Sequence, residues 1–176
     1  NKEAKAFVAT AVNFTDFINV FPDRFTFDSG GPPEQGNNTI VIGYKVNHPD
    51  ETEVPFCKAS DNVTMSLITK TVATFTPPYY RNIIQNFTFT VAGTLEKKGT
   101  PGLTNFDYWV FIPLERVKEI FYKNTTAQYD LIFAKVYNSE DSERIANDIE
   151  GLFPRFRITI LVPLTFIKQV DNILTI

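Results

Sequence analysis

The sequence is poor in the residue types that build metal, redox and nucleophile-base sites. It contains one cysteine, Cys57, and one histidine, His48, in 176 residues. One cysteine excludes an intrachain disulfide and a thiolate metal cluster, and one histidine excludes metal sites that need two imidazole ligands. Cys57 follows Phe56, and we interpret it as a small buried hydrophobic residue, with a reactive thiol as the alternative.

One cation site is still conceivable with this composition. His48 is followed by three acids in the sequence NHPDETE, so four side chains with nitrogen or oxygen ligands lie close along the chain: His48, Asp50, Glu51 and Glu53. The stretch is also polar and contains a proline, which is typical of a solvated loop. We favour the loop, so the sequence predicts no metal and no cofactor.

Long apolar runs and one-sided charge are missing as well. The sequence has no run of about 20 apolar residues, so no segment is predicted to cross a bilayer. Residues 1–7 lack the apolar core of a signal peptide. The net charge is −3 with both signs dispersed along the chain. A nucleic-acid partner is therefore not expected, because nucleic-acid-binding surfaces are basic.

Catalytic signatures are equally scarce. The sequence has no P-loop, GxSxG, HExxH or GxGxxG motif. Two pairs of carboxylates are conceivable as acid and base, Asp107 with Glu115 and Glu140 with Asp141. Their positions along the chain do not predict a shared cleft, and Glu140 and Asp141 suit the first turn of a helix, where the helix dipole favours acids. We therefore predict that the protein is not an enzyme.

Aromatic residues are abundant. Seventeen Phe, seven Tyr and one Trp accompany an apolar fraction of 43%, which is enough to bury a sizeable core. The length is that of one domain or two small ones. The order of the predicted elements indicates an α+β protein, with irregular β structure first and a more regular α/β part after it.

The first part of the chain is predicted to be mainly β. Alternation of apolar and polar residues predicts strands at residues 6–14, 24–28, 39–46, 62–75 and 87–95. A short helical turn capped by Asp16 is predicted before Pro22, and Gly43 indicates a bulge or a close approach of another backbone. Turn-forming residues predict loops at residues 29–38, 47–61 and 96–105, and residues 79–85 are ambiguous after the break at Pro77 and Pro78.

The second part is predicted to alternate strands with helices. Residues 107–112 form a strand covered on both faces, and Pro113 opens a helix with the apolar stripe Leu114, Val117, Ile120 and Phe121. Strands at 129–137 and 156–162 are predicted to form a right-handed parallel β-α-β unit. Its helix is capped by Asn138 or Ser139 and ended by Gly151 and Pro154. Residues 163–176 have helical spacing, either as core or as a lead into a segment beyond the chain.

Five Asn-x-Ser/Thr sequons occur, against about two expected by chance from the composition. They identify the candidate N-glycosylation sites Asn13, Asn37, Asn62, Asn86 and Asn124. The excess favours a surface-exposed protein in an organism that glycosylates such sites. The alternative is that Thr-rich strand sequence generates the pattern without any modification.

Several motifs in a fixed order resemble a known family. They are VIGYKV at 41–46, DNVTMSL at 61–67, FTVAGTLEKKGTPGL at 89–103, VFIPLERVKEIF at 110–121 and YDLIFAKVYNSEDSERIANDIE at 129–150. In this order they resemble the extracytoplasmic (periplasmic core) domain of MacB/FtsX-like ABC transporter permeases. The resemblance covers most of residues 7–174.

The resemblance implies a β-rich (sabre-like) lobe over residues 1–105. A porter-like β-α-β part follows over residues 106–176 and leads toward a membrane helix beyond the chain. The implied domain is non-catalytic and lies on the extracytoplasmic face of the cell membrane. Its implied role is mechanotransmission: a cytoplasmic ATPase subunit moves the membrane helices, and the outer domain changes its grip on an extracytoplasmic partner or cargo, in export or in lipoprotein or peptide handling. Weak homodimerisation is a further implication.

Partner contacts are predicted on two loops, residues 30–38 and 99–105, because loops on a rigid scaffold usually carry binding. The individual residues expected to take part are Phe75, Tyr79, Tyr80, Pro101 and Leu103. For each aromatic residue the alternative is packing in the core. The alternative function is a free-standing cell-surface β-rich module that binds a peptide or a glycan. Membrane helices on either side of the chain would distinguish the two functions.

Overall fold

The computed structural model describes residues 3, 4, 6, 8–34, 37–49, 54–75, 78–99, 105–122, 129, 131–153 and 160. The protein is a mixed α+β chain that divides into two compact units, Asn1–Asp130 and Leu131–Ile176. The division after Asp130 differs from the one predicted after residue 105, and the sheet of the first unit gives the reason.

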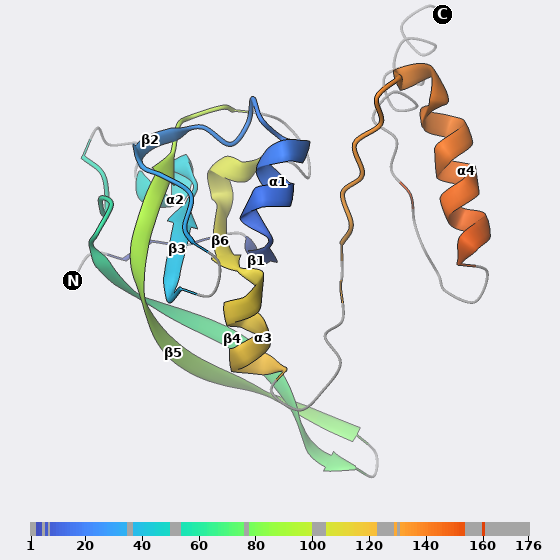
Figure 1. Ribbon diagram of the computed structural model, residues 1–176. Helices are drawn as coiled ribbons and strands as arrows, with labels where there is room; N and C mark the ends of the chain where they lie inside the picture. The colour runs from blue at the N-terminus through green and yellow to red at the C-terminus, as the bar shows by residue number, and fades with distance from the viewer. Residues whose placement is uncertain are drawn as a thin grey trace, which may run out of the picture. The chain divides into compact units, whose positions relative to one another are not determined.

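The described residues of the first unit form one curled, open sheet of six strands accompanied by short helices (Figure 1). Its elements are β1 (Val8–Val12), α1 (Phe14–Val20), β2 (Phe27–Gly30), β3 (Thr39–Ile42), α2 (Tyr44–Asn47), β4 (Asn62–Phe75), β5 (Pro78–Leu95), η1 (Phe106–Tyr108), β6 (Trp109–Pro113) and α3 (Leu114–Phe121).

Strand β6 lies between β1 and β3 in the sheet, although it comes much later in the chain. The sheet order is β1-β6-β3-β5-β2, with β4 also paired to β5. β6 is parallel to β1 and antiparallel to β3, and β3 is parallel to β5. Because β6 pairs with two strands from the first part of the chain, the segment after residue 105 belongs to the first unit.

Strand β5 is paired along both of its edges. Thr90 of β5 pairs with Thr39 of β3 and with Asn62 of β4, so β3 and β4 lie on opposite edges. β2 pairs with the C-terminal end of β5, opposite β3. β2 and β4 therefore follow one another along one edge, and β5 is the central strand of this part of the sheet.

Both faces of the sheet are buried at its centre. Every residue of β6 is buried, as predicted for a strand covered on both faces. On one face Val110 and Ile112 belong to a core cluster with Ile40, Ile42, Val46, Cys57, Phe89 and Val91. Phe111 points the other way, and its ring centroid lies 5.5 Å from Phe17 and 5.0 Å from Phe25. Such aromatic pairs contribute about 1 kcal/mol each beyond their buried area.

Two local predictions in the first unit were wrong. Helix α1 is capped by Asn13 and not by Asp16, because the Asn13 Oδ1 accepts the N–H groups of Thr15 and Asp16 at 3.1 and 3.4 Å. The strand predicted over residues 39–46 ends at Ile42, and Gly43 is the N-cap of helix α2. The predicted close approach at Gly43 is confirmed, since a Cβ there would collide with the carbonyl oxygens of Phe106 and Asp107.

Two strand boundaries also differ from the prediction. Residues 79–85, which were ambiguous, lie inside the long strand β5. The strand predicted at 24–28 lies at Phe27–Gly30 instead, so it includes Ser29 and Gly30, which were predicted to be loop. Strands at residues 62–75 and 8–12, and the helix that follows Pro113, agree with the prediction.

In the described residues of the second unit, the helices are the short η2 (Ser139–Asp141) and the longer α4 (Ser142–Leu152). The Asn138 Oδ1 caps this segment by accepting the N–H of Glu140 at 3.1 Å, as predicted. The helix passes through Gly151 and ends at Leu152.

The strand predicted at 129–137 is wrong over residues 131–136, which form no strand. A strand is stabilised by cross-strand pairing, and these residues pair with no described strand. Residues 156–162, except residue 160, and residues 163–176 lie outside the described residues.

Candidate functional site

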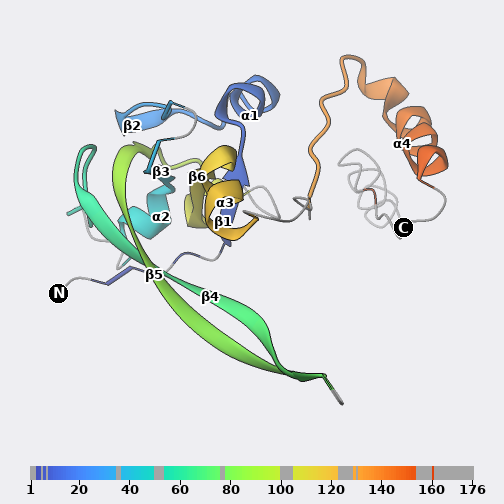
Figure 2. The same ribbon diagram turned by 60° about the horizontal axis from the view of Figure 1, so that its bottom comes forward.

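The most distinctive feature of the first unit is the ribbon formed by β4 and β5, called here the β4–β5 ribbon. The two strands are antiparallel from the pair Asn62–Thr90 to the pair Phe75–Pro78, with one irregularity after Val72. Figures 1 and 2 show this ribbon projecting away from the sheet, well beyond the helices of the unit. At about 3.4 Å per residue, its tip lies about 40 Å from Thr90.

The inner face of the ribbon anchors its base in the core. Val63 pairs with Phe89 and Met65 pairs with Phe87, and these four side chains point to the same face. Phe89 is fully buried, and the other three pack against the core cluster as partly buried residues. The ring of Phe87 also lies 5.7 Å from that of Phe121 in α3. The base is therefore held by packing on the sheet and on α3.

The outer face of the ribbon is polar at its base. The Thr90 hydroxyl donates to the Asn62 Oδ1 at 2.9 Å, and the Ser66 hydroxyl donates to the Asn86 Oδ1 at 2.8 Å. Between these pairs the hydroxyls of Thr64 and Thr88 lie 3.4 Å apart. The next pair on this face is Ile68 with Ile84.

This isoleucine pair is unusually accessible. Ile68 is 68% exposed and Ile84 is 66% exposed, although the two lie opposite each other on neighbouring strands. Two large apolar side chains exposed together form a small apolar surface next to the polar pairs at the base of this face. Such a surface is a candidate for contact with another molecule.

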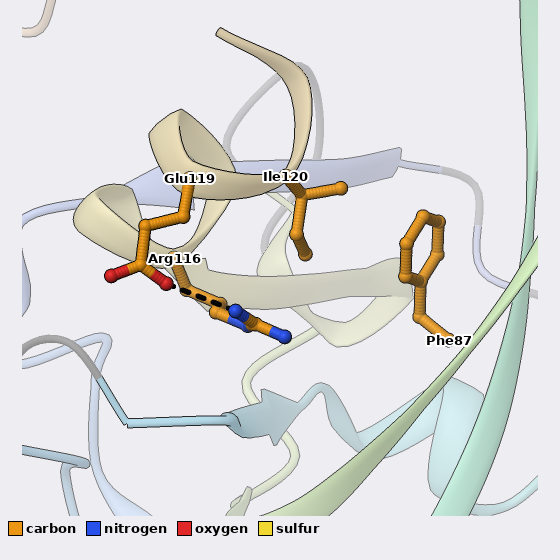
Figure 3. A pocket seen from close by; sticks show the side chains of 4 residues that line it. All are labelled: Phe87, Arg116, Glu119 and Ile120. Atoms are coloured by element: carbon orange, nitrogen blue, oxygen red, sulfur yellow. Dashed lines mark hydrogen bonds and ion pairs between the residues drawn. The ribbon is translucent and has the colours of Figure 1, made fainter. Parts of the chain in front are cut away.

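A hollow of about 440 Å³ lies between α3 and the base of the ribbon, lined by Phe87, Arg116, Glu119 and Ile120. Figure 3 shows Phe87 on one side and the three residues of α3 on the other. The Arg116 guanidinium donates from Nη1 to the Glu119 Oε2 at 2.9 Å and from Nε to the Asn38 Oδ1 at 3.0 Å. Its charge is therefore already paired with a carboxylate inside the hollow.

Asn38 connects this arginine to strand β5. The Asn38 Nδ2 donates to the backbone carbonyl of Thr88 at 2.6 Å, and the backbone carbonyl of Asn38 accepts the N–H of Thr90 at 3.0 Å. Arg116, Asn38 and the backbone of β5 thus form a polar connection between α3 and the base of the ribbon. We interpret the hollow as the gap beside this connection, and the ion pair in it as worth at most about 1 kcal/mol because it is partly exposed.

The predicted contact residues fall into two groups. The backbone pairs Phe75–Pro78, Thr74–Tyr79 and Val72–Tyr80 place Phe75, Tyr79 and Tyr80 together at the tip of the ribbon. Pro101 and Leu103 lie outside the described residues, as does most of the loop predicted to carry them. In the other predicted loop, Asn38 forms part of the connection to Arg116.

Cys57 and His48 have structural surroundings. Cys57 is buried, and its backbone N–H and its Sγ both donate to the Asn47 Oδ1, at 2.9 and 3.3 Å. Burial raises the pKa of the Cys57 thiol to about 11, with a smaller contribution from the charge of Asp61. This is the environment of an unreactive buried cysteine.

The imidazole of His48 stacks on Tyr44 with 4.2 Å between ring centroids, and its Nδ1 lies 3.0 Å from the Tyr44 carbonyl oxygen. Asp50, Glu51 and Glu53 lie outside the described residues. In the part of the chain that the structure describes, no group of three or more potential metal ligands occurs.

The carboxylates considered as acid and base each have a local partner. Asp107 is buried, and its two carboxylate oxygens accept the N–H groups of Lys98 and Gly99 at 3.1 and 2.9 Å. Glu115 accepts from Lys118 at 2.8 Å on the surface of α3. Asp141 accepts from Arg144 at 3.2 Å, and Glu140 lies beside it in the same turn.

Four of the sequon asparagines lie in the described part of the chain, and all four are exposed: Asn13, Asn37, Asn62 and Asn86. Asn124 lies outside it. Asn62 begins β4 as predicted, whereas Asn86 lies in the middle of β5 and not at its start.

Sequence reasoning missed the ribbon as a single unit and the connection between Arg116 and Asn38. The ribbon had a usable signal, since two alternating segments separated by a short proline-containing stretch are typical of a hairpin. The connection between Arg116 and Asn38 had no signal in the sequence, because the two residues are far apart in the chain. No helix among the described residues is long and apolar enough to cross a membrane. Comparison with protein-family models, curated proteins and solved structures found no match to this chain.

Proposed function

We propose that this chain is a non-catalytic extracytoplasmic domain of a MacB/FtsX-like ABC transporter permease. In this proposal a cytoplasmic ATPase moves the membrane helices of the full-length protein, and the domain transmits that motion to a partner or cargo outside the cell membrane. The first unit contributes the β-rich, sabre-like lobe, and the second unit contributes to the porter-like part. The observation that supports it best is the continuity of β5 from the core to the tip of the ribbon.

A continuous strand can transmit motion because it connects two regions without a hinge. Leu95, at one end of β5, is 2% exposed and lies in the sheet, while Pro78, at the other end, lies at the tip. With a tip about 40 Å from the base, a rotation of the base by about 10° moves the tip by about 7 Å. That displacement is large enough to make or break a contact with a partner.

The base of the ribbon is anchored firmly enough to serve as the driven end. Phe89 and Val91 are buried in the core cluster, and the connection through Asn38 and Arg116 attaches the same region to α3. A displacement of α3 or β6 is therefore expected to reach β5 directly. The tip, where the backbone register places Phe75, Tyr79 and Tyr80, is the predicted contact with the partner or cargo.

The first test is the coding sequence on both sides of this chain. The proposal requires an apolar span of about 20 residues before Asn1 and further spans after Ile176. A stop codon directly after Ile176, together with a cleavable signal peptide upstream, would refute it. The free-standing cell-surface peptide- or glycan-binding module would then be the better description.

The second test shortens the ribbon in the full-length protein. Residues 70–82 are replaced by Asn-Gly, which closes the strands at the pair Thr69–Ile83 with a two-residue turn. We expect ATP hydrolysis to persist while transport or partner release driven by ATP is lost. A control with Phe75, Tyr79 and Tyr80 replaced by Ser keeps the ribbon length and separates loss of contact from loss of reach. Normal transport by the shortened variant would contradict the proposed role of the ribbon.

A further inference from the structure

The outer face of the β4–β5 ribbon carries two sequons, one on each strand, whose threonines are paired across the strands. Asn62 and Thr64 belong to one, and Asn86 and Thr88 belong to the other. Residues two apart in a strand point to the same face, so each sequon presents its Asn and its Thr together. The pairs Asn62–Thr90, Thr64–Thr88 and Ser66–Asn86 then place both sequons on one exposed surface.

The amide nitrogens of these two asparagines are available. Asn62 and Asn86 both use Oδ1 as an acceptor within the ribbon, from Thr90 and from Ser66. Within the described residues, neither Nδ2 has a hydrogen-bond partner. By contrast, the Nδ2 of Asn37, another sequon residue, donates to the Glu34 Oε2 at 3.4 Å. The ribbon therefore orients the two amides with their oxygens occupied and their nitrogens unpaired.

The exposed isoleucine pair lies directly beside one of these sites. Ile84 precedes Asn86 by two residues on the same face, at a spacing of about 7 Å, and Ile68 lies opposite Ile84. A sugar ring attached to Asn86 has an apolar face of C–H groups that can lie on such a pair. This arrangement supplies an occupant for an apolar surface that is otherwise exposed to water.

We infer that Asn62 and Asn86 carry N-linked glycans, and that the first sugar on Asn86 covers Ile84 and Ile68. This inference rests on the proposed function, because only the outer side of the membrane offers the modification. In the transfer, a bond forms between the Asn Nδ2 and C1 of a sugar activated as a polyprenyl phosphate or pyrophosphate. The C1–O bond to the phosphate breaks, the amide loses one proton, and the phosphate leaves.

Two glycans fit on this face together. Along the ribbon, the pair that contains Asn86 lies four residue pairs beyond the pair that contains Asn62, which is about 14 Å at strand spacing, so the first sugars do not collide. Glycans here would shield the outer face of the ribbon near its base from other chains. The tip is then left as the surface for a protein partner.

The test is glycopeptide mass spectrometry on the full-length protein from its native source. Sugar mass is expected on the peptides that contain Asn62 and Asn86, and finding both peptides unmodified would overturn the inference. Labelling of intact cells with a membrane-impermeant amine reagent reports the location of the chain independently. A labelled but unmodified chain refutes only the glycans, whereas an unlabelled and unmodified chain refutes the proposed location too.

Substitutions at Thr88 can remove the sequon of Asn86 without disturbing strand β5. Thr88→Val keeps a β-branched side chain but removes the sequon, so the glycan on Asn86 is expected to disappear while that on Asn62 stays. Thr88→Ser keeps the sequon and should keep both glycans. A matched control, Asn37→Gln, should leave both sites unchanged. A glycan that stays on Asn86 in the Thr88→Val variant would show that the modification of Asn86 does not depend on the sequon.

The contact with the isoleucines has its own readout. Enzymatic removal of the glycans should increase the fluorescence of a dye that binds exposed apolar surface. In the double variant Ile68→Thr/Ile84→Thr that increase should be lost, because the surface covered by the sugar is no longer apolar. An undiminished increase in the double variant would show that the sugar covers a different part of the protein.

Discussion

The inner and outer faces of the ribbon should differ sharply in their contributions to stability. Phe89 is fully buried on the inner face, in the core cluster, and Ile84 on the outer face is 66% exposed. Replacing a buried Phe by Ala costs about 3–5 kcal/mol, through lost burial and the cavity that remains. Ile84→Ala removes a side chain that is about one third buried, so about 1 kcal/mol or less is expected.

Trp109 provides a direct assay, since it is the one tryptophan of the chain and is buried beside Phe106 and Phe111. Urea unfolding can be followed by its fluorescence in the 176-residue chain. With a denaturant slope of about 2 kcal/mol/M, Phe89→Ala should lower the midpoint by about 2 M, and Ile84→Ala by less than about 0.5 M.

A natural domain has only about 5–15 kcal/mol of stability in total, so Phe89→Ala can leave little folded protein. Phe89→Leu is the milder companion and should cost about 1.5 kcal/mol. If Phe89→Leu and Ile84→Ala lower the urea midpoint equally, with unchanged slopes, then the base of the ribbon is not anchored by its inner face.

Three further predictions concern other positions of the chain. Asn47→Ala leaves the buried N–H of Cys57 without its acceptor, so the free energy of unfolding in urea should fall by about 1–3 kcal/mol. A fall below about 0.5 kcal/mol would contradict a contribution of that hydrogen bond to stability. Gly43→Ala places a Cβ against the carbonyls of Phe106 and Asp107 and should destabilise by about 2 kcal/mol, whereas Gly151→Ala, where a Cβ meets nothing, should be neutral or stabilising. The folded-state pKa of Cys57, about 11, lies above its ordinary value of 9.0, so the unfolded thiol ionises first and stability should fall as pH rises from 9 to 11. Urea unfolding across that range checks this, and an equal fall in Cys57→Ala would assign the effect to other groups.

Local patterns predicted the elements of this chain better than their partners. The strand at residues 62–75 and the helices after Pro113 and Asn138 follow from alternation, helical spacing and capping, which act within a few residues. The strand expected at 129–137 had a suitable pattern as well, yet residues 131–136 are not in a strand. A strand pattern favours extended backbone, but a strand forms only where a neighbour supplies hydrogen bonds.

The candidate site was predictable in part. The apolar residues around two prolines point to Phe75, Tyr79 and Tyr80 as contact residues, and the backbone register of β4 with β5 places all three at the tip. The sequons were visible in the sequence, but their position on one face depends on that same register. The connection of Arg116 to Asn38 was not predictable, since helix α3 and the segment before β3 become neighbours only when the sheet forms.

The sequence by itself determined the kind of molecule: an aromatic-rich α+β chain with one cysteine, one histidine and no common catalytic motif. It also determined most strand and helix positions, because periodicity and capping are properties of neighbouring residues. The tertiary structure alone decided that β6 joins β1 to β3 and that β5 is paired along both edges. It also decided which face of the ribbon is buried. These choices depend on contacts between residues distant in the chain, where burial of the whole core, and not any local preference, selects the pairing.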